Sequence, residues 1–167
     1  MLGWGQRRQQ EVSEVLYGNA VEMAREPVFF AEHGVADTVD GRFDALALVV
    51  ALIMRRLKDC GEAGHELSQQ LFDTMFADMD LSLREMGAGD IGVAKRVRVM
   101  AEAFMGRLEA YASALDSGDR VALAAALQRN LLRGDGKAGE QLIDFVLELE
   151  ARIAGIDRES LLRGKLD

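Results

Sequence analysis

The chain is poor in cysteine and proline, with only Cys60 and Pro27 among its 167 residues. A single cysteine excludes an internal disulfide and a cysteine-based zinc site, and it favours a reducing compartment. The scarcity of proline and the shortage of alternating β-branched segments indicate an all-helical protein. The longest uncharged apolar run, residues 45–54, is too short to cross a bilayer, which needs about 20 helical residues.

The chain also lacks an apolar segment near its start of the kind found in secretory signals. Glu11 and Glu14 follow Arg7 and Arg8 at once, unlike the pattern of a transit peptide. We therefore expect a cytoplasmic protein, and docking at a membrane surface stays open. The net charge of −8 argues against bulk nucleic-acid binding.

Apolar residues at helical spacing predict an all-α, single-domain bundle of about six to eight helices over residues 1–167. Segment 42–58 is apolar on nearly all sides, so we expect it to be the central helix of the core. The other predicted helices span residues 10–25, 27–33, 65–86, 90–115, 119–132 and 139–154, with a last short turn at 157–163.

Residues 87–92, GAGDIG, match the GxGxxG pattern of dinucleotide-binding loops. That motif requires a preceding strand, whereas an amphipathic helix precedes this one. We therefore interpret the segment as a corner between two helices. Gly87 is expected to end the first helix in a left-handed conformation, and Asp90 is expected to cap the second.

The acidic residues before this corner do not form a predicted catalytic pair. Asp78 and Asp80 are two residues apart and point to different sides of a helix, while Asp80 and Arg84 have the i, i+4 spacing of an ion pair. His33 and His65 lack the spacing of metal ligands. We predict no catalytic residue, no metal and no cofactor. A helical ligand-binding protein or enzyme that uses Asp78, Asp80 and Arg84 remains an alternative.

A basic cluster follows the corner, at Lys95, Arg96, Arg98 and Arg107. Helical spacing places Arg96 and Arg107 on one side, about three turns apart. The cluster is either a solvated face or a docking patch for an anionic or polar partner. A ribosome-docking adaptor is therefore a second alternative, to be tested by the salt dependence of binding.

Three blocks of the chain resemble the ubiquinol–cytochrome c chaperone family over about residues 16–132. The blocks are PVFFAEHGVADTVDGRFDALALVVALIMRRL, FADMDLSLREMGAGDIGVAKRVRVMAEAFMGRLEAY and LQRNL. The resemblance implies a small all-helical protein that assists assembly of the cytochrome bc1 complex, respiratory complex III. Mitochondrial relatives work with a small helical partner near the ribosomal exit and receive new cytochrome b. The short leader is typical of a bacterial member, peripheral to the inner membrane at most.

The resemblance also implies a set of partner-binding residues. They are Asp37, Asp40, Arg42, Asp44, Asp78, Asp80, Arg84, Asp90, Lys95, Arg96, Arg107, Tyr111 and Asn130. The chain departs from the family pattern at Val49, where members often have histidine. The resulting hypothesis is a non-enzymatic chaperone that binds cytochrome b or an early bc1 assembly intermediate, with a ribosome or a small helical partner as further candidates.

Overall fold

The computed structural model describes residues 1, 3–87 and 89–167, and within them every regular element is a helix. The prediction of an all-α fold is therefore confirmed. The helices are α1 (Trp4–Ala24), α2 (Val28–Ala31), α3 (Val39–Leu57), α4 (Gly61–Glu85), α5 (Asp90–Ser117), α6 (Arg120–Asn130), α7 (Glu140–Ala154) and α8 (Arg158–Leu161).

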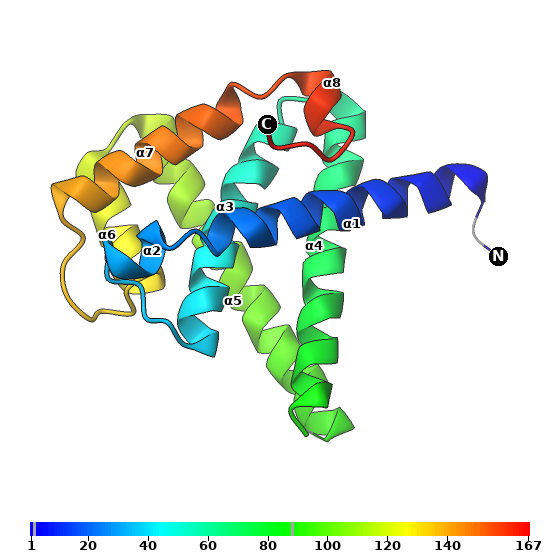
Figure 1. Cartoon of the computed structure of the whole chain (residues 1–167), viewed down its shortest axis with the longest axis horizontal. Coiled ribbons are helices and arrows are strands. Elements are labelled where there is room, and N and C mark those ends of the chain that lie inside the picture. The colour runs from blue at the N-terminus through cyan, green and yellow to red at the C-terminus, as the bar shows by residue number, and fades with distance from the viewer. Residues whose placement is uncertain (2, 88) are drawn as a thin grey trace.

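Helix α3 is the centre of the fold, as its apolar sequence predicts. It contacts α1, α4, α5 and α7, and residues 43–53 are buried without interruption (Figure 1). The side chain of Thr38 caps its first turn by accepting a hydrogen bond from the Gly41 N–H at 3.1 Å. A Cβ on Gly41 would lie 1.8 Å from the Ala36 carbonyl oxygen, so the chain turns into α3 through a contact that requires glycine.

Three helices begin earlier than the sequence predicts. Helix α1 starts at Trp4 rather than Gln10, α3 at Val39 rather than Arg42, and α4 at Gly61 rather than His65. The added turns are mostly polar and carry no apolar periodicity. In α1, a tertiary contact supports the added residues instead. The Gln9 side chain donates a hydrogen bond to a carboxylate oxygen of Glu66 on α4, at 3.0 Å.

Helices α4 and α5 form a hairpin whose corner extends beyond the other helices (Figure 1). Near the body, Phe72 and Phe76 of α4 pack against Phe104 of α5, with ring centroids 5.8 and 5.9 Å apart. Near the corner, Leu83 and Val93 are buried but lie outside the main core cluster. The hairpin therefore has a core-supported base and a projecting tip.

At the corner, the predicted helix end at Gly87 is confirmed and the predicted cap at Asp90 is wrong. Ala88, within the corner, lies outside the described residues. Gly87 has a φ of +88°, the left-handed conformation expected at a helix end. Asp90 is not the cap, because Gly89 takes the N-cap position without a side-chain bond and Asp90 is the first helical residue. The Asp90 carboxylate instead accepts a hydrogen bond from Arg84, whose Nε lies 2.5 Å from Asp80 Oδ1 in the predicted ion pair.

Within the described residues, no helix is both long enough and apolar enough to span a bilayer.

Candidate functional site

A groove of about 310 Å³ lies between α1, the start of α3 and the C-terminal half of α4, and we call it the α1–α3–α4 groove. Its apolar lining includes Val21 from α1, Leu46 from α3 and Met79 from α4. These three residues come from segments far apart in the sequence. The groove exists only because α1 and α4 both pack on α3.

Two large apolar side chains on this groove are exposed. Val39, the first residue of α3, is 62% exposed, and Met86, at the C-terminal end of α4, is 65% exposed. Exposed apolar residues that adjoin a groove mark interaction sites more often than isolated ones do. Methionine also adapts its flexible side chain to apolar partners of different shape. The groove can therefore bind an apolar segment of a larger molecule.

Polar groups accompany this apolar lining. The Tyr17 hydroxyl donates a hydrogen bond to Asp78 Oδ2 at 2.7 Å. Burial, together with that bond to a carboxylate, raises the pKa of Tyr17 above its ordinary value, so the phenol stays neutral. Arg42 Nε lies 2.8 Å from Asp37 Oδ1, and the two side chains are 62% and 64% exposed. Arg25, a second exposed cation of the groove, has no ion pair among the described residues. Both cations are available to a partner, since an exposed pair is weak.

A buried ion-pair network lies at the other side of the start of α3. The Asp44 side chain is fully buried and accepts hydrogen bonds from Arg107 Nη1 at 2.7 Å and from Arg133 Nε at 2.5 Å. Arg107 also lies over the Phe43 ring, with its guanidinium carbon 5.6 Å from the centroid. This network joins α3, α5 and the loop after α6, and we call it the Asp44 network.

Tyr111 lies close to the Asp44 network without bonding to it. Its ring is buried and its hydroxyl has no hydrogen-bond partner in the described part of the chain. Burial raises the pKa of Tyr111 above its ordinary value. Asp44 and Tyr111 are therefore inaccessible to a partner in this structure, and their structural role is to hold the helices together.

The basic cluster is divided between the surface and the interior. Lys95, Arg96 and Arg98 are exposed and have no ion pair among the described residues. Arg107 is only 14% exposed at its side chain because it pairs with Asp44. The expectation that Arg96 and Arg107 share one exposed face is wrong. Arg96 lies in the part of α5 that projects near the corner, whereas Arg107 lies in the part that packs against α3.

The predicted partner-binding residues thus fall into separate places rather than one site. Arg42 and Asp78 line the α1–α3–α4 groove, whereas Asp80, Arg84, Asp90, Lys95 and Arg96 lie along the hairpin near its corner. Asp37 lies just before α3, and Asp40 lies in its first turn. The Asp40 Oδ1 atom is 3.9 Å from Arg133 Nη2. Asn130 is a half-buried residue at the end of α6. The groove residues Tyr17, Arg25, Val39 and Met86 were not predicted as site residues.

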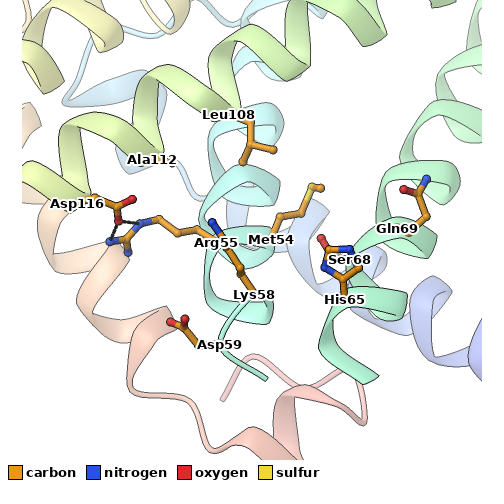
Figure 2. A pocket seen from close by; sticks show the side chains of 10 residues that line it. All are labelled: Met54, Arg55, Lys58, Asp59, His65, Ser68, Gln69, Leu108, Ala112 and Asp116. Atoms are coloured by element: carbon orange, nitrogen blue, oxygen red, sulfur yellow. Dashed lines mark hydrogen bonds and ion pairs between the residues drawn. The ribbon is translucent and has the colours of Figure 1, made fainter. Parts of the chain in front are cut away.

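A second cavity, of about 430 Å³, opens between α3, α4 and α5 (Figure 2). Met54 and Leu108 give it an apolar part, and one face of α4 contributes His65 and Gln69. Neither Asp78 nor Asp80 lines it. A deep pocket with these two carboxylates converging inside it would support the ligand-binding or enzymatic alternative, and this cavity does not bring them together.

Each of those carboxylates has a separate partner, since Asp78 bonds to Tyr17 and Asp80 to Arg84. Within residues 1, 3–87 and 89–167, no group of three or more histidine, cysteine or acidic side chains is arranged to hold a metal ion. The exposed apolar residues Val39 and Met86 belong to the α1–α3–α4 groove rather than to the second cavity.

Comparison with known proteins identifies the family of the chain. The family model described as ubiquinol-cytochrome C chaperone matches residues 31–167. A Xenopus laevis protein, ubiquinol-cytochrome-c reductase complex assembly factor 1, is 29% identical over 150 residues, which are 88% of this chain and 74% of that protein. The crystal structure of the Cbp3 homolog from Brucella abortus superposes with a TM-score of 0.83 at 36% identity, covering 96% of this chain and 90% of the other.

Proposed function

Because the chain belongs to the ubiquinol-cytochrome c chaperone family, we propose that it is a non-enzymatic assembly chaperone of the cytochrome bc1 complex, respiratory complex III. Its client is cytochrome b or an early assembly intermediate that contains it. The chaperone acts in the cytoplasm, at or near the inner face of the inner membrane. A ribosome or a small helical protein as a further partner stays a prediction.

The observation that carries the proposal is the α1–α3–α4 groove with its exposed Val39 and Met86. A membrane-protein client has apolar helices that must be kept from aggregating before the complex forms. A groove of about 310 Å³ accepts a few apolar side chains of such a helix rather than the whole helix. The client helix would therefore lie across the groove and anchor through one or two residues.

The polar groups of the groove supply orientation. Arg25 and Arg42 are exposed cations near the apolar lining, and Asp78 is held in place by the Tyr17 hydroxyl. Charges arranged around an apolar contact improve specificity and the rate of encounter more than they improve affinity. A small apolar anchor with an exposed polar surround also favours release, which an assembly chaperone needs.

Gene deletion followed by complementation tests the proposal in the native cell. Loss of the gene should lower the amount of assembled bc1 complex and its quinol oxidation. Val39→Lys and Met86→Lys should fail to restore assembly while the chaperone stays folded, because both positions are exposed and tolerate a charge. Val121→Lys is the matched control, since Val121 is 80% exposed on α6 and lies outside the groove.

Two outcomes would contradict the proposal. Normal levels of assembled complex after deletion would remove the function itself. Full restoration by the Val39 and Met86 variants would leave the function intact but exclude the α1–α3–α4 groove as the binding site.

A further inference from the structure

The projecting tip of the α4–α5 hairpin carries exposed apolar side chains. Ile91, in the first turn of α5, is 89% exposed, and Met86 at the end of α4 is 65% exposed. Leu81, just over one turn earlier on α4, is 55% exposed. Their exposure agrees with the projection of the hairpin corner beyond the other helices (Figure 1).

The outer face of α5 changes its chemistry with distance from this tip. Ile91, Lys95, Arg98 and Glu102 recur every three or four residues, so they share one face of the helix. At a rise of about 1.5 Å per residue, Lys95 is about 6 Å from Ile91 along the helix axis, Arg98 about 10 Å and Glu102 about 16 Å. The order from the tip is therefore apolar, then cationic, then acidic.

The cations of this face are free to bind an external anion. Lys95, Arg96 and Arg98 are all exposed, and none has an ion pair within the described residues. The acidic groups at the corner are mostly engaged, since Asp80 and Asp90 both bind Arg84. Because one guanidinium offsets only one carboxylate, Asp80, Asp90 and Arg84 together keep one negative charge, and the exposed Glu85 adds a second against the three cations.

This sequence of layers matches the boundary of an anionic lipid membrane. Apolar side chains of peripheral proteins enter about 5–10 Å into the region between headgroups and acyl chains. With Ile91 at that depth, Lys95 and Arg98 reach the phosphate layer and Glu102 remains in water. The rest of the protein is acidic, with a net charge of −8 for the whole chain, so an anionic surface repels the body and favours approach by the tip.

We propose that the hairpin tip, through Ile91, Met86, Lys95 and Arg98, docks on the surface of an anionic phospholipid membrane. Ile91, Lys95 and Arg98 lie outside the α1–α3–α4 groove, so tests at these three positions do not depend on the client, whereas Met86 belongs to both surfaces. It also gives the chaperone a defined orientation. The α1–α3–α4 groove, which Met86 lines as well, then lies at the membrane side of the molecule, where the apolar helices of a membrane protein emerge.

A tryptophan reporter tests the contact with purified protein and lipid vesicles. The chain has one tryptophan, Trp4, which begins α1 and is 88% exposed. Arg7 and Arg8 follow it closely in the sequence. Ile91→Trp in a Trp4→Phe background therefore reports on the tip alone. We expect its emission to shift to the blue with mixed phosphatidylcholine–phosphatidylglycerol vesicles, and to shift far less with phosphatidylcholine alone or at high salt.

Charge variants in the same reporter background measure the cationic layer. One cation near an anionic surface contributes about five-fold in affinity, so Lys95→Gln with Arg98→Gln should weaken vesicle binding roughly 25-fold. Lys137→Gln with Lys165→Gln removes the same charge elsewhere on the surface and should change binding little.

Three results would overturn the inference. One is the absence of a blue shift from the indole introduced at position 91. Another is a shift of native Trp4 alone, which would assign the membrane contact to the free end of α1. The third is co-sedimentation with ribosomes but not with vesicles, which would assign the cations to ribosomal RNA.

Discussion

Removal of the Asp44 carboxylate is expected to destabilise the chain far more than removal of an exposed carboxylate. Asp44 is fully buried and accepts hydrogen bonds from Arg107 and Arg133. Its loss leaves the Arg107 guanidinium, which is 14% exposed, without a counter-charge in the interior. The α5 helix and the loop after α6 then lose their shared anchor on α3.

The size of the effect follows from burial. Breaking a buried ion pair from one side costs about 3–5 kcal/mol, because the remaining charge is desolvated without compensation. For a chain of this length that corresponds to a fall in melting temperature of roughly 6–20 °C. Asp37 is the matched control, since its pair with Arg42 is 64% and 62% exposed and is worth at most about 1 kcal/mol.

Urea unfolding followed by circular dichroism measures both free energies of unfolding. We expect Asp44→Ala to lose about 3–5 kcal/mol and Asp37→Ala to lose less than about 1 kcal/mol. A double-mutant cycle should give a larger coupling of Asp44 with Arg107 than with Arg133, whose side chain is 49% exposed. Equal losses for Asp44→Ala and Asp37→Ala would show that burial does not strengthen the Asp44 ion pairs.

Three further predictions concern the groove and its supports. Gly41→Ala should lower the unfolding free energy by about 1–3 kcal/mol, because the added Cβ would lie 1.8 Å from the Ala36 carbonyl oxygen. An unchanged urea midpoint would contradict this. Tyr17→Phe should cost about 1.5–3 kcal/mol through loss of the bond to the Asp78 carboxylate, and a loss below about 0.5 kcal/mol would count against that bond. Tyr17 and Tyr111 should show no tyrosinate absorbance near pH 10 while the chain is folded, because burial raises the pKa of each. The neutral phenols contribute their full stabilisation below the unfolded pKa of about 10, and this contribution is lost as the pH rises through the raised pKa of the folded state. Titration of either phenol at its ordinary pKa in the folded protein would be the contrary result.

Sequence reasoning predicted the features that depend on local pattern. The apolar character of residues 42–58 on all sides identified α3 as the buried helix, and the i, i+4 spacing identified the Asp80–Arg84 pair. The left-handed Gly87 followed from its place between two amphipathic segments. Each of these depends on residues within a few positions of one another.

Sequence reasoning missed one contact within the corner and one contact between distant segments. Asp90 was predicted as a cap because aspartate favours that position, but Arg84 across the corner binds its carboxylate and Gly89 takes the cap. Arg107 has the angular position predicted for it on α5. Its depth was not predictable, because it depends on the packing of α5 against α3 and on the buried Asp44.

The α1–α3–α4 groove could not be predicted for the same reason. Val39 and Met86 are separated by 47 positions in the sequence and stand at the ends of two helices, where a single apolar residue carries no periodic signal. Family resemblance pointed to Arg42 and Asp78, which do line the groove. It did not distinguish them from Asp44 and Tyr111, which are buried.

Site-specific photo-crosslinking in the native cell can decide whether the α1–α3–α4 groove holds cytochrome b. A photoreactive amino acid placed at Val39 should capture newly made cytochrome b, and the same probe at Val121 should not, since both positions are exposed but only Val39 lines the groove. We expect capture of cytochrome b from position 39 before the bc1 complex is complete. Equal capture from both positions, or none from position 39 in cells that assemble the complex normally, would contradict it.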